Sequence, residues 1–277
     1  MSDFVRQNAA VVDFNTSDSW VILSPIELSI KKKIEAVGVP LKDWDINIYR
    51  GVLTGYNEAF IISTEKRDEI LSNCQSEEER QRTEELIRPI LRGRDIKRYG
   101  YDWAGLWLIN THNGIKGKLE RIHIEDYPAV KAHLDQYWDK ISVRADKGET
   151  PYNLRNCAYL DDFSKPKIVY REISVEMEAC LAPESWMINN KLYMITSNSE
   201  CLEYICAFLN SKLFSKIIMS SVNFGGGKGV DFLGSIKLPY FDKCGVFDLS
   251  QNAIAIDPYF YQLFGLTTNE IEFIETL

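Results

Sequence analysis

The sequence has few of the histidines and none of the paired cysteines that form structural zinc sites. It contains three histidines, and none of its six cysteines forms a CxxC pair with another. Structural zinc sites need ligands at such spacings. We therefore predict no metal site, and we interpret the thiols as reduced, small apolar residues of the core.

Long apolar segments are also lacking. No run approaches the roughly 20 apolar residues of a membrane span, and the first residues have neither the basic flank nor the apolar core of a signal peptide. The sequence therefore favours a cytoplasmic protein that does not contact a membrane.

An excess of positive charge is missing too. The 32 basic residues are outnumbered by 40 acidic residues, which gives a formal net charge of −8. This balance argues against a general affinity for nucleic acid. However, basic residues gather in three segments, at 88–99, 165–171 and 213–237. The sequence is therefore still compatible with a local basic face.

Neither candidate phosphate-binding loop is complete. Residues 224–230 read FGGGKGV, but Gly229 follows Lys228 where a phosphate loop carries Ser or Thr for magnesium. Residues 51–60 read GVLTGYNEAF, and they lack the third glycine and the following helix of a dinucleotide-binding loop. We interpret both segments as turns, from which Lys228 can still contact a DNA phosphate.

Hydrolytic and transfer motifs are incomplete as well. Asp161 and Asp162 precede two lysines, but Pro166 interrupts the strand in which a metal-dependent nuclease carries its acid–x–lysine element. An NPPY-like loop, a GxSxG elbow and an HExxH helix are all absent from the sequence. We therefore predict no catalytic site in this chain.

Local patterns predict a mixture of helices and strands. Ser24, Pro25 and Glu27 form a capping box that opens a helix ending at Gly38. We expect a β-hairpin from 46–53 and 59–62 with its turn at 54–57, a second hairpin folded at 189–190, and further helices at 64–71, 77–87, 128–141, 200–219 and 269–276. Because these elements do not alternate as regular βαβ units, the fold class is α+β, with mixed or antiparallel sheets and interspersed helices. Residues 142–164 are expected to form a long functional loop.

One basic segment lies among aromatic residues. Arg92, Arg94, Lys97 and Arg98 precede Tyr99 and two further aromatic residues. This pattern is compatible with a solvated surface segment or with a ridge that contacts phosphates, because arginine and lysine make most contacts with the DNA backbone.

The order of several segments resembles a known family. In chain order they are IYRGVLTGYNEAF, IRPILRGRDIKRY, LWLI, YPAVKAHLDQYWDKISVRADKGETPYNLR, FSKPKIVYREIS, FLNSKLF and IKLPYF. Together they resemble the TaqI-like C-terminal specificity domain, the target-recognition part of adenine-specific DNA methyltransferases and of fused type IIG restriction–modification enzymes. The ending FYQLFGLTTNEIEFIE is similar to the C-terminus of those proteins.

The resemblance implies a domain organisation. Residues 1–23 would be a linker from a missing methyltransferase region, 24–240 the DNA target-recognition domain, and 241–277 a helical tail packed on it. No cofactor is expected in this chain, since S-adenosylmethionine, and Mg²⁺ where a nuclease is fused, would bind the missing regions. The implied partners are double-stranded DNA and the methyltransferase region of the parent protein.

The resemblance also divides the candidate contacts. Motifs shared by proteins that read different DNA sequences would form scaffold or phosphate contacts, which assigns to the DNA backbone Arg92, Arg94, Lys97, Arg98, Lys165, Lys167 and Lys228. Polar residues of long loops would read base edges through bidentate bonds, and these candidates are Arg144, Lys147, Tyr152, Asn153, Arg155, Asn156 and Asn223.

The implied function is noncatalytic, sequence-specific DNA recognition within a type II restriction–modification methyltransferase. Two alternatives remain open. The chain could have intrinsic methyltransferase or endonuclease activity, or it could be a protein-interaction module that docks on a partner methyltransferase.

Overall fold

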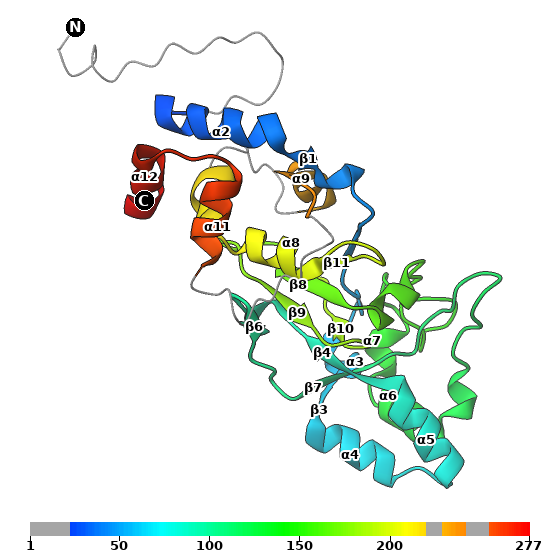
Figure 1. The fold of residues 1–277 in the computed structure, drawn as a ribbon. Coiled ribbons are helices and arrows are strands. Elements are labelled where there is room, and N and C mark those ends of the chain that lie inside the picture. Colours follow the sequence, from blue (N-terminus) through cyan, green and yellow to red (C-terminus); the bar gives the residue numbers. More distant parts are fainter. Residues whose placement is uncertain (1–22, 220–228, 242–254) are drawn as a thin grey trace, which may run out of the picture. The chain divides into compact units, whose positions relative to one another are not determined.

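The computed structural model describes residues 23–219, 229–241 and 255–277. The chain divides into two compact units (Figure 1). The second unit consists of residues 47–172 and 179–197, and the first contains the remaining segments. This division follows contacts within the chain, so the domain boundaries expected at residues 24 and 240 stay a prediction.

One sheet of the second unit is mixed. Its strand order is β10 (Met187–Ile188), β4 (Ile87–Leu91), β7 (Leu106–Ile109) and β3 (Ile61–Ser63). The β10–β4 pair is parallel and the other two pairs are antiparallel. Pro89 lies inside β4, at a position paired with β7.

The other large sheet of this unit is antiparallel. Its order is β2 (Asn47–Arg50), β11 (Leu192–Thr196), β8 (Lys167–Arg171) and β9 (Ala179–Ala182). Strand β8 is buried along four of its five residues, which are Lys167 and the apolar run Ile168, Val169 and Tyr170. The predicted α+β fold with mixed and antiparallel sheets is confirmed.

Both predicted hairpins are wrong. Strand β2 pairs with β11 and β3 pairs with β7, so the two arms expected at 46–62 belong to different sheets. Likewise β10 pairs with β4, and not with β11 across the turn at 189–190. Local turn chemistry suggested neighbouring partners, whereas each strand pairs with one distant in sequence.

Gly51 lies where these sheets meet. Its backbone N–H donates to the Leu192 carbonyl at 2.9 Å, and the next N–H, of Val52, donates to the Ile188 carbonyl at 2.8 Å. A Cβ atom at position 51 would lie 2.1 Å from the carbonyl oxygen of Asn189. Because such a contact is impossible, only glycine permits this close backbone approach.

Three helices of the second unit contact the mixed sheet, and they are α3 (Asn57–Phe60), α4 (Thr64–Ser72) and α5 (Glu77–Leu86). Helix α6 (Pro128–Asp135) packs on α3 and α4, and α7 (Trp138–Ile141) follows α6 in the chain. The helices expected at 64–71 and 77–87 are confirmed, although α4 is capped by Ser63 and not by Thr64. The buried carboxylate of Glu79 accepts from the N–H groups of Ala129 and Gln75, which ties α5 to the start of α6.

Short elements complete this unit, and they are η2 (Gly93–Asp95), β5 (Ile96–Lys97), β6 (Gly100–Tyr101), η3 (Ile124–Asp126) and η4 (Leu160–Ser164). Residues 142–159 contain no helix or strand, apart from one isolated bridge between Lys147 and Leu154. The expected long loop is therefore present.

The first unit is mainly helical. Its elements are α2 (Pro25–Val37), β1 (Val39–Pro40), η1 (Leu41–Asp43), α8 (Leu202–Leu209), the π-helical η5 (Leu213–Ile218), α9 (Val230–Ser235), β12 (Lys237–Leu238), α11 (Ile256–Leu263) and α12 (Thr268–Thr276). The predicted capping box of α2 is confirmed, with Ser24 N–H donating to Glu27 at 2.7 Å. The single helix expected at 200–219 is divided between α8 and η5.

Glu270 joins two helices of the first unit. It caps α12 through Thr267, and it also accepts hydrogen bonds from Ser29 at 2.8 Å and Lys33 at 2.6 Å on α2. Although burial acts to raise it, these hydrogen bonds, led by that from Lys33, lower the pKa of Glu270 to about 2.

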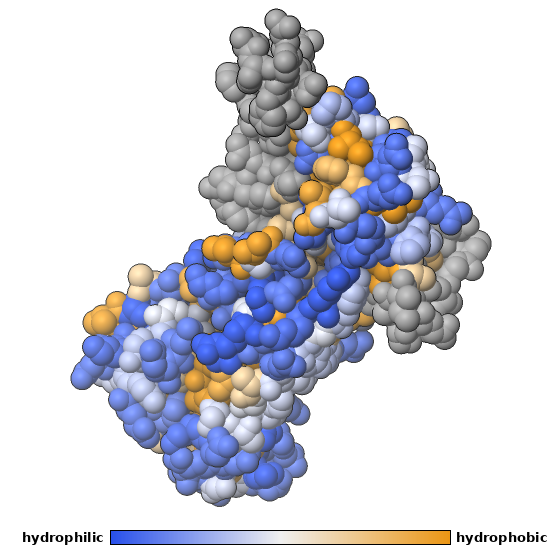
Figure 2. All heavy atoms as spheres, turned by 90° about the vertical axis from the view of Figure 1, so that its left-hand side faces the viewer, coloured by the Kyte–Doolittle hydropathy of each residue, from blue (hydrophilic) through white to orange (hydrophobic). Residues whose placement is uncertain are grey.

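Some large apolar side chains are exposed in the described segments, and Val143, Ile173 and Val175 are the most exposed of them. Figure 2 shows mainly hydrophilic side chains on the face that it displays, with small apolar groups between them. No helix in the described ranges has both the length and the apolar character that crossing a bilayer requires.

Candidate nucleic-acid interface

Arg144 lies at the centre of the long loop and is buried, with 7% of its surface exposed. Its guanidinium donates to four backbone carbonyl oxygens, which belong to Thr54, Asp146, Pro151 and Asn153. The cation also lies over the ring of Phe60, 4.4 Å from its centroid. Burial lowers the pKa of Arg144 to about 10, so the group remains charged at neutral pH.

These contacts join two distant motifs. Thr54 and Phe60 belong to GVLTGYNEAF, whereas the other acceptors lie on the loop 145–153. Gly55 adopts a φ of +71°, and a Cβ atom there would lie 2.9 Å from the Asp146 carbonyl oxygen. The segment 51–60 is therefore a structural support for the long loop.

Asn153 has a structural role as well. It is 1% exposed. Its side-chain oxygen accepts from Thr150 Oγ1 at 2.7 Å, and its Nδ2 donates to the Ile122 carbonyl at 2.8 Å. Arg144 and Asn153 were both predicted to read bases, and their burial corrects that assignment, because neither polar group is presented to solvent.

A tight β-turn structure precedes η3 and faces the long loop. Ile115 and Leu119 pair in antiparallel fashion, with N–O distances of 2.8 and 2.9 Å. Gly114 and Gly117 have φ values of +71° and +76°, a region that favours glycine. We call residues 113–121 the basic hairpin, because Lys116, Lys118 and Arg121 lie on it.

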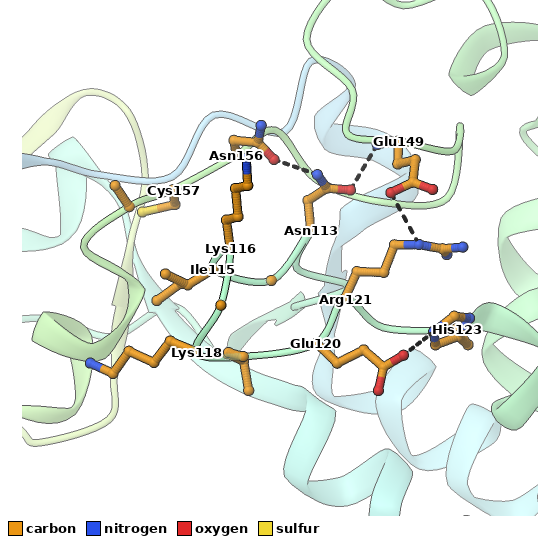
Figure 3. Close-up of a pocket in the computed structure, with 14 residues that line it drawn as sticks. Asn113, Ile115, Lys116, Lys118, Glu120, Arg121, His123, Glu149, Asn156 and Cys157 are labelled. Carbon is orange, nitrogen blue, oxygen red and sulfur yellow. Dashed lines mark hydrogen bonds and ion pairs between the residues drawn. The ribbon is translucent and has the colours of Figure 1, made fainter.

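An open hollow of about 960 Å³ lies against the basic hairpin. Figure 3 shows the hairpin along one side of it, and Glu149, Asn156 and Cys157 along the other. Lys116 is exposed, and Lys118 has 67% of its side chain exposed. The hollow therefore combines exposed cations with polar side chains of the long loop.

Acidic partners neutralise part of this charge. Lys118 pairs with Asp161, and Arg121 Nε lies 3.3 Å from a Glu149 oxygen. His123 Nε2 lies 3.0 Å from Glu120. Exposed pairs of this kind contribute only about 0–1 kcal/mol, so a phosphate group can compete with the carboxylates.

Cys157 contributes a thiol to the wall of the hollow. Burial raises the pKa of this thiol to about 11. At neutral pH the thiol is therefore protonated, which makes it a poor nucleophile.

The remaining base candidates of the long loop lie near its surface. Lys147, Arg155 and Asn156 are exposed, with Arg155 3.4 Å from Asp146. Lys147 donates to the Ser142 carbonyl at 2.7 Å. Tyr152 is half-buried and donates to Asp135 at 2.6 Å. Asn223 and Lys228 lie outside the described residues.

Of the predicted backbone contacts, Lys167 is fully buried. Its ammonium donates to the carbonyl oxygens of Phe163, Lys165 and Pro183, and burial lowers its pKa to about 8. This burial corrects the predicted phosphate contact. Lys165 remains partly exposed and pairs with Asp162 at 2.7 Å.

The segment 92–98 separates into a support and a surface. Arg92 binds the buried carboxylate of Asp95 through both its N–H and its guanidinium, at 2.8 and 3.0 Å. Arg94, Lys97 and Arg98 are exposed. They form what we call the basic ridge, and they remain candidates for phosphate contacts.

The ridge and the hollow lie at opposite edges of the antiparallel sheet. Tyr99, beside the ridge, donates its N–H to the Ala179 carbonyl on β9, whereas Tyr159, beside Cys157, donates to the Arg50 carbonyl on β2. Strands about 4.8 Å apart separate β9 from β2 by roughly 14 Å. The two basic surfaces are therefore distinct.

The basic hairpin was missed by the reading of the sequence. Its signal is local, since NG at 113–114 is a turn dipeptide and another glycine, Gly117, lies between two lysines. No local signal distinguished Arg144 from an exposed arginine, because all of its acceptors are backbone carbonyls.

Comparison with known proteins identifies the family. The model of the TaqI-like C-terminal specificity domain matches residues 88–228, slightly more than half of the chain. The chain therefore belongs to this family. No curated protein matches it.

Two solved structures are similar to this chain. The type IIL restriction–modification enzyme MmeI, determined in complex with DNA, is 12% identical with a TM-score of 0.43, over 63% of this chain and 22% of that one. The type IIG restriction endonuclease BpuSI is 12% identical with a TM-score of 0.48, over 92% of this chain and 28% of that one. The chain thus spans less than a third of the length of either.

Proposed function

We propose that this chain recognises a DNA sequence for a restriction–modification enzyme and performs no catalysis itself. Membership of the specificity-domain family is the observation that carries the proposal. The site supports it, because the hollow has cations for phosphates and short amide side chains for base edges.

The basic hairpin can offer its cations to a DNA groove. The major groove of B-DNA is about 12 Å wide and admits a two-stranded β-ribbon. The basic hairpin is a tight turn closed by one antiparallel bridge between Ile115 and Leu119, and it exposes Lys116 and Lys118. The long loop supplies Arg155 and Asn156 beside it. We propose that the hairpin enters the groove and that the loop contacts the bases.

The parent enzyme would supply the chemistry. We propose an adenine-specific methyltransferase region that binds S-adenosylmethionine, with or without a nuclease that uses Mg²⁺. The net charge of −8 fits this division of roles, because a general attraction to DNA would then come mainly from the other regions. This chain by itself should bind DNA weakly and with a steep dependence on salt.

Titration of binding against salt tests the proposal. Replacing Lys116 and Lys118 with Gln should reduce the slope of log K against log salt by up to about 1.8, since each lost phosphate contact accounts for about 0.9. The matched control replaces Lys66 and Lys140, which lie on α4 and α7 of the same unit and do not line the hollow, and should leave the slope unchanged. Equal slopes in both double variants would contradict the proposal.

The two alternatives give different results. Transfer of a labelled methyl group from S-adenosylmethionine to DNA, or cleavage of DNA with Mg²⁺, would show that the chain itself is an enzyme. Binding to a methyltransferase that survives the Lys116 and Lys118 substitutions, with no measurable binding to DNA, would favour the protein-interaction module.

A further inference from the structure

We propose that Asn156 reads an adenine in the major groove, because contacts in the hollow hold its amide in the orientation that adenine requires. This inference rests on the proposed function and assigns one base to one residue. It follows from two connected hydrogen bonds, of which the first fixes the amide orientation of Asn113 and the second fixes that of Asn156.

The first step fixes Asn113. The backbone N–H of Glu149 can only donate, and it lies 2.7 Å from Oδ1 of Asn113. That atom must therefore be the amide oxygen. The loop backbone lies directly against it, because a Cβ atom at Gly148 would approach the same oxygen to 2.4 Å. Nδ2 of Asn113 then necessarily points the other way.

The second step fixes Asn156. Nδ2 of Asn113 donates to Oδ1 of Asn156, so the latter is the acceptor of the pair (Figure 3). The Nδ2 group of Asn156 is turned away from this contact. Its oxygen retains a second lone pair, since an amide oxygen accepts two hydrogen bonds.

This orientation matches one base. Adenine presents the N7 acceptor and the N6 amino donor in the major groove, and an asparagine binds both with its Nδ2 and its Oδ1. Guanine presents two acceptors, N7 and O6, so the asparagine oxygen would face another oxygen. Asn156 is exposed and can therefore reach a base edge.

The arrangement is held in place before DNA binds. Arg144 binds three carbonyls of the loop 145–153. The Gly148 N–H donates to the Asn153 carbonyl at 2.9 Å, and the Leu154 N–H donates to the Thr111 carbonyl at 2.8 Å. The backbone that orients Asn113 is therefore fixed at both ends, so little ordering is left to occur on binding.

Selection from a pool of random duplex DNA tests the inference, with the full chain as the bait and sequencing as the readout. Asn156→Asp leaves only acceptor oxygens, which suit the cytosine amino group. One adenine in the wild-type motif should change to cytosine, and the preference for adenine there should fall about tenfold to hundredfold. The control Asn73→Asp changes an exposed amide on the C-cap of α4 and should leave the motif unchanged.

Asn113→Asp tests the relay without touching the base reader. A carboxylate at 113 cannot donate, so Asn156 should rotate its amide and present its oxygen outward. The adenine preference should fall at the same position as in Asn156→Asp. Circular dichroism and thermal melting of each variant would show that the fold is retained.

The outcomes separate the two claims. If the wild type enriches no motif, the proposed function fails and this inference fails with it. If the wild type enriches a motif that Asn156→Asp leaves unchanged, the inference is overturned and the proposed function stands. If Asn156→Asp alters a position that Asn113→Asp does not affect, the relay through Asn113 is overturned.

Discussion

Replacing Arg144 with Met should destabilise the protein strongly. The partners of Arg144 are backbone carbonyl oxygens, so the sequence alone does not indicate this effect. The substitution keeps much of the side-chain volume and removes the guanidinium. Four backbone carbonyl oxygens, which belong to Thr54, Asp146, Pro151 and Asn153, then lose their donor. The ring of Phe60 loses its cation.

The size of the loss follows from these contacts. A hydrogen bond to a charged group contributes about 1.5–3 kcal/mol, but contacts made by one group are not additive. Each buried carbonyl oxygen that is left without a donor costs about 1–3 kcal/mol. We expect a decrease in the free energy of unfolding of about 3–5 kcal/mol, which is a large part of the stability of an ordinary domain.

Urea unfolding of the full chain measures this loss. Arg155→Met is the matched control, because Arg155 lies on the same loop with an exposed side chain and a single partner at 3.4 Å, and it should cost at most about 1 kcal/mol. Hydrogen exchange adds a local readout, since the amides of Gly148 and Leu154 should lose protection in Arg144→Met alone. A loss below about 1 kcal/mol, or unchanged protection at these amides, would refute the structural role of Arg144.

Three further substitutions test the fold. Gly51→Ala should cost more than about 3 kcal/mol in chemical unfolding, because the added Cβ meets a backbone oxygen at 2.1 Å, whereas Gly100→Ala, with nothing within 4 Å, should cost less than about 1 kcal/mol. Glu270→Gln should lower the free energy of unfolding by about 3 kcal/mol at pH 7 and by almost nothing near pH 2. The pKa of Glu270 is lowered from 4.5 to about 2 in the folded state. The ionised carboxylate therefore stabilises the fold above pH 4.5, and this stabilisation is lost as the pH falls to about 2. The free energy of unfolding of Lys167→Met, relative to the wild type, should fall by about 2 kcal/mol between pH 7 and pH 9.5. The pKa of Lys167 is lowered from 10.5 to about 8 in the folded wild type. The unfolded wild-type chain therefore binds more protons in this range, and the wild type gains stability as the pH rises. A pH-independent difference in either of the last two comparisons would contradict the assigned ionisation.

Elements whose signals are local were predictable from the sequence. The capping box at Ser24 opens α2 as expected, because the cap and the helix are neighbours in the chain. The two hairpins were not predictable from their turns. Strand β2 finds its partner about 145 residues later, on β11, and a turn sequence contains no information about a partner so distant. The glycine at position 51 was visible, but its reason lies in that distant pairing.

The difference between local signals and distant contacts also explains which site residues were assigned wrongly. Arg144, Asn153 and Lys167 were assigned to DNA because polar residues in a basic or loop segment are usually exposed. Each is instead buried and bound chiefly to backbone atoms. Every residue has a backbone carbonyl, so acceptors of this kind leave no trace in the sequence. The basic hairpin, in contrast, has a turn dipeptide, a second glycine and lysines that a closer reading of residues 113–118 detects.

This use of backbone acceptors also has a consequence for recognition. Arg144 fixes the loop 145–153 through carbonyl oxygens alone, so the conformation of the loop depends on few of its own side chains, chiefly the buried amide of Asn153, and on Gly148. The basic hairpin depends in the same way on backbone pairing and on Gly114 and Gly117. Residues such as Asn156 can therefore change identity without altering the frame that positions them. On the proposed function, single substitutions at the hollow should change the DNA specificity without loss of stability, because the fold and the proposed base contact depend on different atoms.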